Sequence, residues 1–172
     1  SKVFYVNAES GSKTEFSSGD SALEVAFDAG GYQGSTTNPK MKLRVPARHD
    51  LVEFLQGVDE RVKTHVAEHL DEPEEKLEHL QKLSLQQPSP EYDANFVLKV
   101  EGAKVILRNA EGKKIGKGTW GDIVKGSQVQ VVFKPLKGFI ERASSRFGVD
   151  WQAVKINLWT PEHLPEPEES SD

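Results

Sequence analysis

Aromatic rings and cations are interleaved between residues 96 and 160, in a pattern suited to contacting an unpaired nucleic acid strand. The rings are Trp120, Phe133, Phe139, Phe147, Trp151 and Trp159, and the same stretch holds twelve Lys or Arg side chains. Cations bind backbone phosphates, and flat rings stack on unpaired bases for about 1–3 kcal/mol per base without reading a sequence. Rings also fill hydrophobic cores, so we expect at least half of these six to be buried, with Trp151 and Phe133 first among them.

The candidate binding residues are cations and rings that strands or loops would present on a surface. Lys134 and Lys137 follow a strand that alternation predicts over 129–133, and Pro135 with Gly138 predicts a loop that projects both cations. A second cationic face is predicted where three cations alternate with apolar residues on a strand over 40–45. The candidate nucleic-acid-binding residues are Lys40, Lys42, Arg44, Lys99, Trp120, Lys134, Lys137, Phe139, Arg142, Arg146 and Lys155.

Residues for catalysis or metal binding are sparse by comparison. His65 and His69 have the i, i+4 spacing of metal ligands on a helix, but their sequence HVAEH does not place a glutamate as HExxH does. Two surface histidines on an acidic helix explain the pattern better. The run GKGT at 116–119 shares only its composition with a phosphate-binding loop and predicts a hairpin turn. We therefore expect no enzyme, no metal and no cofactor.

The length and composition are those of one ordinary domain. A chain of 172 residues with 36% hydrophobic residues can build one core, which excludes collagen-like and wholly disordered classes. It has no cysteine, so disulfides, thiol chemistry and Cys-ligated zinc are excluded, which fits a reducing compartment. No apolar run approaches the ~18–20 residues of a membrane span, and no signal peptide is expected.

Charge is distributed in blocks, which matters more than the net charge of −5. Residues 96–160 hold twelve basic and five acidic side chains, whereas residues 48–95 hold five basic and twelve acidic ones. The last twelve residues, 161–172, hold five acids and no Lys or Arg. A basic module can therefore act locally although the chain as a whole is acidic. A basic surface that is merely solvated is the alternative.

Short strands with one helical insertion are predicted along the chain. Alternating residues indicate strands over 3–6, 23–28, 40–45, 96–100, 105–108, 113–118, 129–133 and 154–159. The strand over 23–28 would place Phe27 on its buried face. Between about 50 and 83 the apolar period becomes that of amphipathic helices, with Val58, Val62 and Val66 on one face and Leu83 at the end of the stripe.

These elements predict a mainly β fold, an OB-fold-like small β-barrel over residues 1–160. The helical insertion would lie between its third and fourth strands, and a disordered acidic tail would follow over 161–172. A β-sandwich is the structural alternative, because it also consists of short alternating strands.

Three stretches carry a family resemblance: 89–99 (SPEYDANFVLK), 122–133 (DIVKGSQVQVVF) and 147–151 (FGVDW) leading into 154–159 (VKINLW). With the helical insertion before them and the acidic tail after them, they resemble the single-stranded-DNA-binding proteins of large DNA viruses and T7-like phages. The resemblance covers roughly residues 90–172. It implies an OB-fold barrel with a cationic groove, base-stacking rings, and an acidic tail that competes for the groove or docks partner enzymes.

Together these features predict a sequence-tolerant single-stranded-DNA-binding protein, accessory to DNA replication, recombination or repair. The resemblance implies a polymerase or helicase as partner of the tail. It also implies an intracellular location, in a phage-infected cell or in a host nucleus or viral factory, and it leaves a homodimer open. An RNA-binding OB module would use the same residues, and a non-enzymatic protein-interaction β-domain would use the same basic face for an acidic partner. No membrane partner is expected.

Overall fold

The chain folds mainly into strands, as its alternating residues predict. The computed structural model describes residues 2–4, 15–30, 38–141 and 143–165. Its strands are β1 (Lys2–Phe4), β2 (Phe16–Ser17), β3 (Leu23–Val25), β4 (Lys40–Val45), β5 (Gln81–Lys82), β6 (Leu85–Gln86), β7 (Ala94–Lys99), β8 (Lys104–Arg108), β9 (Lys114–Gly118), β10 (Gln128–Ile140) and β11 (Phe147–Trp159). Its helices are α1 (Asp50–Leu70) and α2 (Glu74–Leu77), with 3₁₀ turns η2 (Glu78–Leu80), η3 (Trp120–Asp122) and η4 (Pro161–His163).

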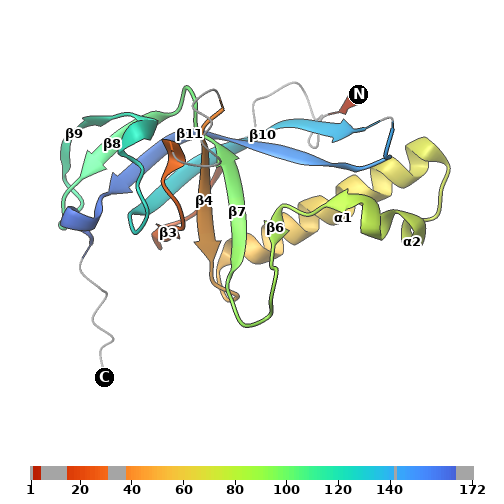
Figure 1. The fold of residues 1–172 in the computed structure, drawn as a ribbon, viewed down its shortest axis with the longest axis horizontal. Coiled ribbons are helices and arrows are strands. Elements are labelled where there is room, and N and C mark those ends of the chain that lie inside the picture. The colour runs from red at the N-terminus through yellow and green to blue at the C-terminus, as the bar shows by residue number, and fades with distance from the viewer. Residues whose placement is uncertain (1, 5–14, 31–37, 142, 166–172) are drawn as a thin grey trace.

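Five of these strands close into a barrel (Figure 1). The order around the ring is β3, β4, β7, β11 and β10, and β10 also pairs with β3. Neighbours run antiparallel except β7 and β11, which are parallel. A closed five-stranded ring is the architecture of an OB-fold. The predicted OB-fold-like barrel is confirmed, and the β-sandwich alternative is wrong.

The helical insertion lies between β4 and β7, the second and third strands of the ring. The prediction placed the insertion between the third and fourth strands of the barrel. The structure places it one strand earlier, because β1 pairs with β10 outside the ring and is not a barrel strand. The imidazole Nδ1 of His49 accepts a hydrogen bond from the Leu51 N–H (3.1 Å) and caps α1, which buries the predicted stripe of valines. Leu83 is 51% exposed instead of buried, because it lies in the turn between β5 and β6 rather than on a helix.

Aromatic rings pack at the centre of the barrel and join it to α1. The ring centroid of Phe133 lies 5.3 Å from that of Phe96 and 5.5 Å from that of Trp151. Phe16 from β2 and Phe54 from α1 lie 6.0 and 6.2 Å from Phe133. These tilted and edge-on geometries are the ones that aromatic quadrupoles favour. The predicted burial is confirmed for four of the six rings, namely Phe133, Phe147, Trp151 and Trp159.

β10 and β11 form a long antiparallel hairpin, and its far end extends beyond the barrel over α1 (Figure 1). We call this far end the arm (residues 137–141 and 143–149). The ladder register shifts between Val132 and Phe133 and again between Pro135 and Lys137. The loop predicted around Pro135 is therefore wrong: Lys134 and Lys137 lie within β10. A bulge accommodates a proline that a regular ladder would exclude.

The chain leaves the barrel beside the β8–β9 hairpin. The Trp159 indole Nε1 donates to the backbone carbonyl of Asn109 (2.8 Å), and the 3₁₀ turn η4 follows at once. Described structure thus continues to residue 165, past the predicted start of the tail at 161. The rest of the predicted acidic tail, 166–172, lies outside the described residues.

Candidate nucleic-acid interface

A row of outward-facing residues crosses four neighbouring strands of the barrel. Lys40 on β4 pairs with Lys99 on β7, Lys99 pairs with Gln152 on β11, and Gln152 pairs with Lys134 on β10. Paired side chains point to the same face of a sheet, and this face is the outer one because the alternating neighbours are core residues. Strands lie about 4.8 Å apart, so the row spans about 14 Å. Three predicted cations therefore lie in one row on the outer face of the barrel.

Two more predicted cations, Lys42 and Arg44, lie further along β4, next to this row. Lys42 pairs with Val97 and Arg44 with Asn95, again facing outward. The Lys42 Nζ lies 5.0 Å from the ring centroid of Phe27, which is 48% exposed. The prediction that Phe27 faces the core is wrong, because β3 ends at Val25 and the chain turns away before Phe27. An exposed ring beside a cation can stack on an unpaired base.

A carboxylate, Asp150, lies on β11 beside the row. Its Oδ1 is 3.7 Å from the Lys82 Nζ and its Oδ2 is 3.8 Å from the Lys99 Nζ. Lys137 is its partner in the β10–β11 ladder. Both ion-pair distances exceed those of hydrogen bonds, so the two ammonium groups keep their donors for other acceptors. We call the following set the basic face: Lys40, Lys42, Arg44, Lys82, Lys99, Lys134 and Lys137.

A cavity of about 140 Å³ opens beside three lysines of the basic face. Lys40, Lys82, Lys99 and Asp150 line it, together with the buried Trp151. The exit segment, by which we mean β5, β6 and the turn between them, forms one wall.

A buried carboxylate, Asp59, holds the exit segment in place. Its Oδ2 accepts from the Ser84 N–H (2.8 Å), and its Oδ1 accepts from the Ser84 hydroxyl (2.7 Å). The Ser84 Oγ in turn accepts from the Trp151 indole Nε1 (2.8 Å). Burial raises the pKa of the Asp59 carboxyl above its usual value, and the hydrogen bonds from Ser84 act in the opposite direction. These three hydrogen bonds connect α1, the exit segment and β11.

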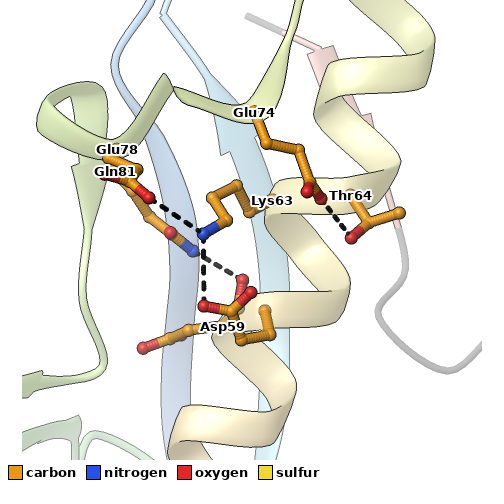
Figure 2. A network of polar contacts seen from close by, with 7 residues as sticks. Asp59, Lys63, Thr64, Glu74, Glu78 and Gln81 are labelled. Carbon is orange, nitrogen blue, oxygen red and sulfur yellow. Dashed lines mark hydrogen bonds and ion pairs between the residues drawn. The ribbon is translucent and has the colours of Figure 1, made fainter. Parts of the chain in front are cut away.

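A second polar network joins α1 to η2 and to the start of the exit segment (Figure 2). The Lys63 Nζ donates to Glu60 (3.2 Å) and lies 3.8 Å from a carboxylate oxygen of Glu78. The Gln81 side-chain amide donates to the backbone carbonyl of Asp59 (2.7 Å). The hydrogen bond to Glu60 raises the pKa of Lys63, so this ammonium stays charged. The wall that carries Lys82 is therefore held at several points.

Gly148 lets the exit segment approach the arm, and a side chain there should destabilise the protein. A Cβ at this position would lie 2.9 Å from the Lys82 carbonyl oxygen and 3.3 Å from the Phe139 ring. We expect Gly148→Ala to lower the free energy of unfolding by about 1–3 kcal/mol, because backbone must shift to relieve the overlap. Urea unfolding followed by tryptophan fluorescence measures the change.

Gly57→Ala is the matched control, because Gly57 lies within α1 and a Cβ there would meet nothing within 4 Å. Alanine should instead raise stability by roughly 0.5–1 kcal/mol through its helix propensity. Equal stability of the Gly148→Ala protein and the wild type would contradict the close packing of the exit segment on β11.

The remaining candidates divide by their places in the fold. Phe139 lies on the arm with its ring centroid 6.0 Å from the Lys82 Nζ, next to the basic face. Trp120 is half-buried and packs over Gly30, whose added Cβ would lie 3.0 Å from the indole. Lys155 pairs with residues of β8 and β10, beyond the end of β7. Arg146 is exposed at the tip of the arm, away from the cavity. Arg142 lies outside the described residues.

Two weaker sequence motifs have structural outcomes. His65 and His69 lie on the exposed side of α1, and no cluster of three metal-ligating residues occurs in the part of the chain that the structure describes. The run 116–119 is not the predicted hairpin turn, because most of it belongs to β9. Among the described residues, no helix is both long enough and apolar enough to cross a membrane.

Sequence reasoning missed three members of this surface, namely Phe27, Lys82 and Asp150. Lys82 lies in an acidic block that is predicted to be helical, and its lone charge carries no local signal. Asp150 belongs to a stretch that resembles the phage proteins, but only strand pairing brings it to Lys99. Phe27 could have been found from the Asp-Ala-Gly-Gly run that follows it, which indicates a loop.

Solved structures share this arrangement of strands. The single-stranded DNA binding protein gp2.5 of bacteriophage T7 superposes with a TM-score of 0.53 at 15% identity, over 94% of this chain and 92% of that chain. The single-stranded DNA-binding protein of bacteriophage Enc34 superposes with a TM-score of 0.51 at 12% identity, over 100% of this chain and 97% of that chain. The chain has the fold of these phage proteins.

The resemblance read from the sequence is thereby confirmed at the level of the fold. No protein-family model matches the sequence, and no curated protein matches it either. The superposition covers nearly all of each chain, so the likeness extends over the whole fold.

Proposed function

We propose that this chain binds single-stranded DNA without sequence preference, through the basic face and the rings beside it. The observation that carries the proposal is the register of Lys40, Lys99 and Lys134, which aligns three cations across four strands. Cations in a line follow a nucleic acid backbone, and each phosphate they neutralise releases a counterion. The proposed activity is equilibrium binding without catalysis.

The location of the basic face supports the same ligand. β4 and β7 are the second and third strands of the ring, and OB-folds use this face to bind oligonucleotides. The T7 and Enc34 proteins that share the fold are single-stranded DNA-binding proteins. The likeness supports a similar ligand here.

Half-exposed rings would supply the stacking that distinguishes single strands from duplex. Phe27 lies beside Lys42, and Phe139 lies beside Lys82, so each ring has a cation next to it. Base stacking on such rings contributes about 1–3 kcal/mol per base and requires an unpaired base. Duplex DNA hides its base faces, so only its phosphates would contact the basic face.

The wider setting follows from the proposed ligand. A protein that coats exposed single strands serves DNA replication, recombination or repair inside a cell. The acidic segment 161–172 would act as a tethered competitor for the basic face, or as a docking peptide for a polymerase or helicase. An RNA strand or an acidic protein surface would meet the same cations, and the experiment below separates these ligands from DNA.

Labelled oligo(dT) should bind more tightly than duplex DNA of the same length, and its affinity should fall steeply with salt. The logarithm of the affinity should fall with the logarithm of salt concentration by about 0.7 per phosphate contacted. Fluorescence anisotropy at several salt concentrations measures both quantities, with oligo(U) as the competitor that tests for an RNA preference.

Three results would contradict the proposal. Equal affinity for single strands and duplex would exclude a role for base stacking. A flat salt response would favour an acidic protein partner over a nucleic acid. Tighter binding of oligo(U) than of oligo(dT) would identify an RNA-binding module, which could recognise the 2′-hydroxyl.

A further inference from the structure

We infer that the cavity lined by Lys40, Lys82 and Lys99 is a site for one phosphate group, and that Asp150 is the resident anion with which this phosphate competes. The inference rests on the proposed function and adds to it a defined position on the basic face. The inferred role of Asp150 is opposite to that of the neighbouring lysines. Its carboxylate weakens DNA binding, and it stabilises the positions of the lysines when no DNA is bound.

The charges around the cavity leave room for one more anion. Three lysines line it, and the only carboxylate among its lining residues is Asp150. Lys40 and Lys99 face each other across the β4–β7 ladder, an arrangement of like charges that is unfavourable without an anion between strands. Asp150 offsets part of this repulsion, but a net positive charge remains. A phosphate would offset the rest.

The ion pairs of Asp150 are loose enough to be shared. Its oxygens lie 3.7 and 3.8 Å from the Lys82 and Lys99 ammonium groups, beyond hydrogen-bond distance. The side chain of Lys99 is 24% exposed and that of Asp150 is 20% exposed, so the two charges are partly shielded from water. Each ammonium has three donors, and a phosphate oxygen entering the cavity can accept from them while Asp150 stays in place.

The cavity is held open before any ligand arrives. Ser84, in the wall next to Lys82, is fixed by both oxygens of Asp59 and by the Trp151 indole. Gly148 brings the Lys82 backbone against β11. Lys82 is thus positioned by its own backbone, whereas lysines on a flexible loop would lose more freedom on binding.

Asp150→Asn tests the inference because it removes the resident anion and keeps the shape of the side chain. We expect it to tighten oligo(dT) binding by about three- to tenfold, since a like charge a few ångströms from the phosphate is removed. The salt dependence should steepen as well, because a further cation becomes available to DNA. Glu111→Gln, in the turn between β8 and β9, makes the same change of net charge far from the cavity and should leave binding unchanged within about twofold.

Lys82→Gln is the opposite test and does not depend on the folding of the Asp150 variant. It should weaken oligo(dT) binding by about tenfold, as expected for the loss of one charge-assisted phosphate contact. Lys117→Gln on β9 is its control for net charge. Oligo(dT) with and without a 5′-phosphate distinguishes the source of the phosphate. If the site binds a strand end, Asp150→Asn should raise the affinity more for the phosphorylated oligomer. If it binds an internal phosphodiester, the gain in affinity should be equal for both oligomers.

The outcomes separate this inference from the proposed function. If wild-type protein binds oligo(dT) but Asp150→Asn behaves as Glu111→Gln does, or Lys82→Gln behaves as Lys117→Gln does, the phosphate site is wrong and the proposed function stands. If wild-type protein does not bind oligo(dT) at any salt concentration, the proposed function fails and the inference fails with it.

Discussion

Replacing Lys40, Lys99 and Lys134 together by glutamine should weaken oligo(dT) binding by about a hundredfold to a thousandfold. Each charge-assisted contact to a phosphate contributes roughly 1–1.5 kcal/mol, and about 1.4 kcal/mol corresponds to tenfold in affinity. The three lysines lie in one row across β4, β7, β11 and β10, so they are expected to act on one strand of DNA. Fluorescence anisotropy with labelled oligo(dT) at low salt measures the loss.

The control for this experiment changes the same number of charges at the other end of the barrel. Lys113, Lys114 and Lys117 are exposed on the β8–β9 hairpin, and their replacement by glutamine lowers the net charge equally. Screening limits the effect of distant charges, so the control should lose less than about fivefold. A similar loss in both triple variants would mean that the protein attracts DNA through its overall charge and has no groove.

Asp59→Ala should cost about 3 kcal/mol of unfolding free energy, because two partly buried donors lose their acceptors at once. The Ser84 N–H and the Ser84 hydroxyl both donate to this carboxylate, and each unsatisfied buried group costs about 1–3 kcal/mol. For a chain of this size, that loss lowers the melting temperature by roughly 6–12 °C. Urea unfolding and calorimetry measure the two quantities, and a loss below about 1 kcal/mol would contradict the anchoring role.

Asp59→Asn separates the hydrogen bonds from the charge. Its amide oxygen can still accept from the Ser84 N–H, so it should destabilise the protein less than alanine does. Burial raises the folded-state pKa of Asp59 above its unfolded value, so the folded protein binds a proton more readily between the two values. This group should therefore make wild-type stability fall as pH rises through that window, and the fall should be absent from the asparagine variant. Parallel pH profiles for the two proteins would show that Asp59 ionises in the folded state as it does in the unfolded chain.

Local patterns in the sequence predict the strands well where one face is buried. Along 40–45 the cations alternate with core residues, so both the strand and its outward cations follow from the period alone. The same reasoning fails at Pro135, because a proline is read as a strand breaker unless the bulge that accommodates it is known. It fails again at Phe27, because the alternation of large apolar residues continues for two residues beyond the end of β3.

The candidate site itself depends on pairings that are distant in sequence. The alignment of Lys99 with Gln152, and of Gln152 with Lys134, requires the order of strands around the ring. Lys82 reaches the cavity only because the exit segment packs on β11. No periodicity in the sequence contains this information, so composition could predict a basic surface but could not predict which cations share it.

The pairing of β11 has a consequence for how the protein is made. This strand pairs with β10, β7, β8 and β5, and it is the last of the described strands in chain order. As translation proceeds from the N-terminus, the ring stays open until the segment Phe147–Trp159 has left the ribosome. Until then β7 lacks its pairing with β11 at Lys99 and the aromatic centre lacks Trp151. Closure joins segments far apart in the chain, which is slow. The barrel therefore closes only after this segment has been synthesised. A ribosome paused before residue 147 holds a chain in which β8 lacks its β11 partner, and such an open sheet edge is prone to aggregation.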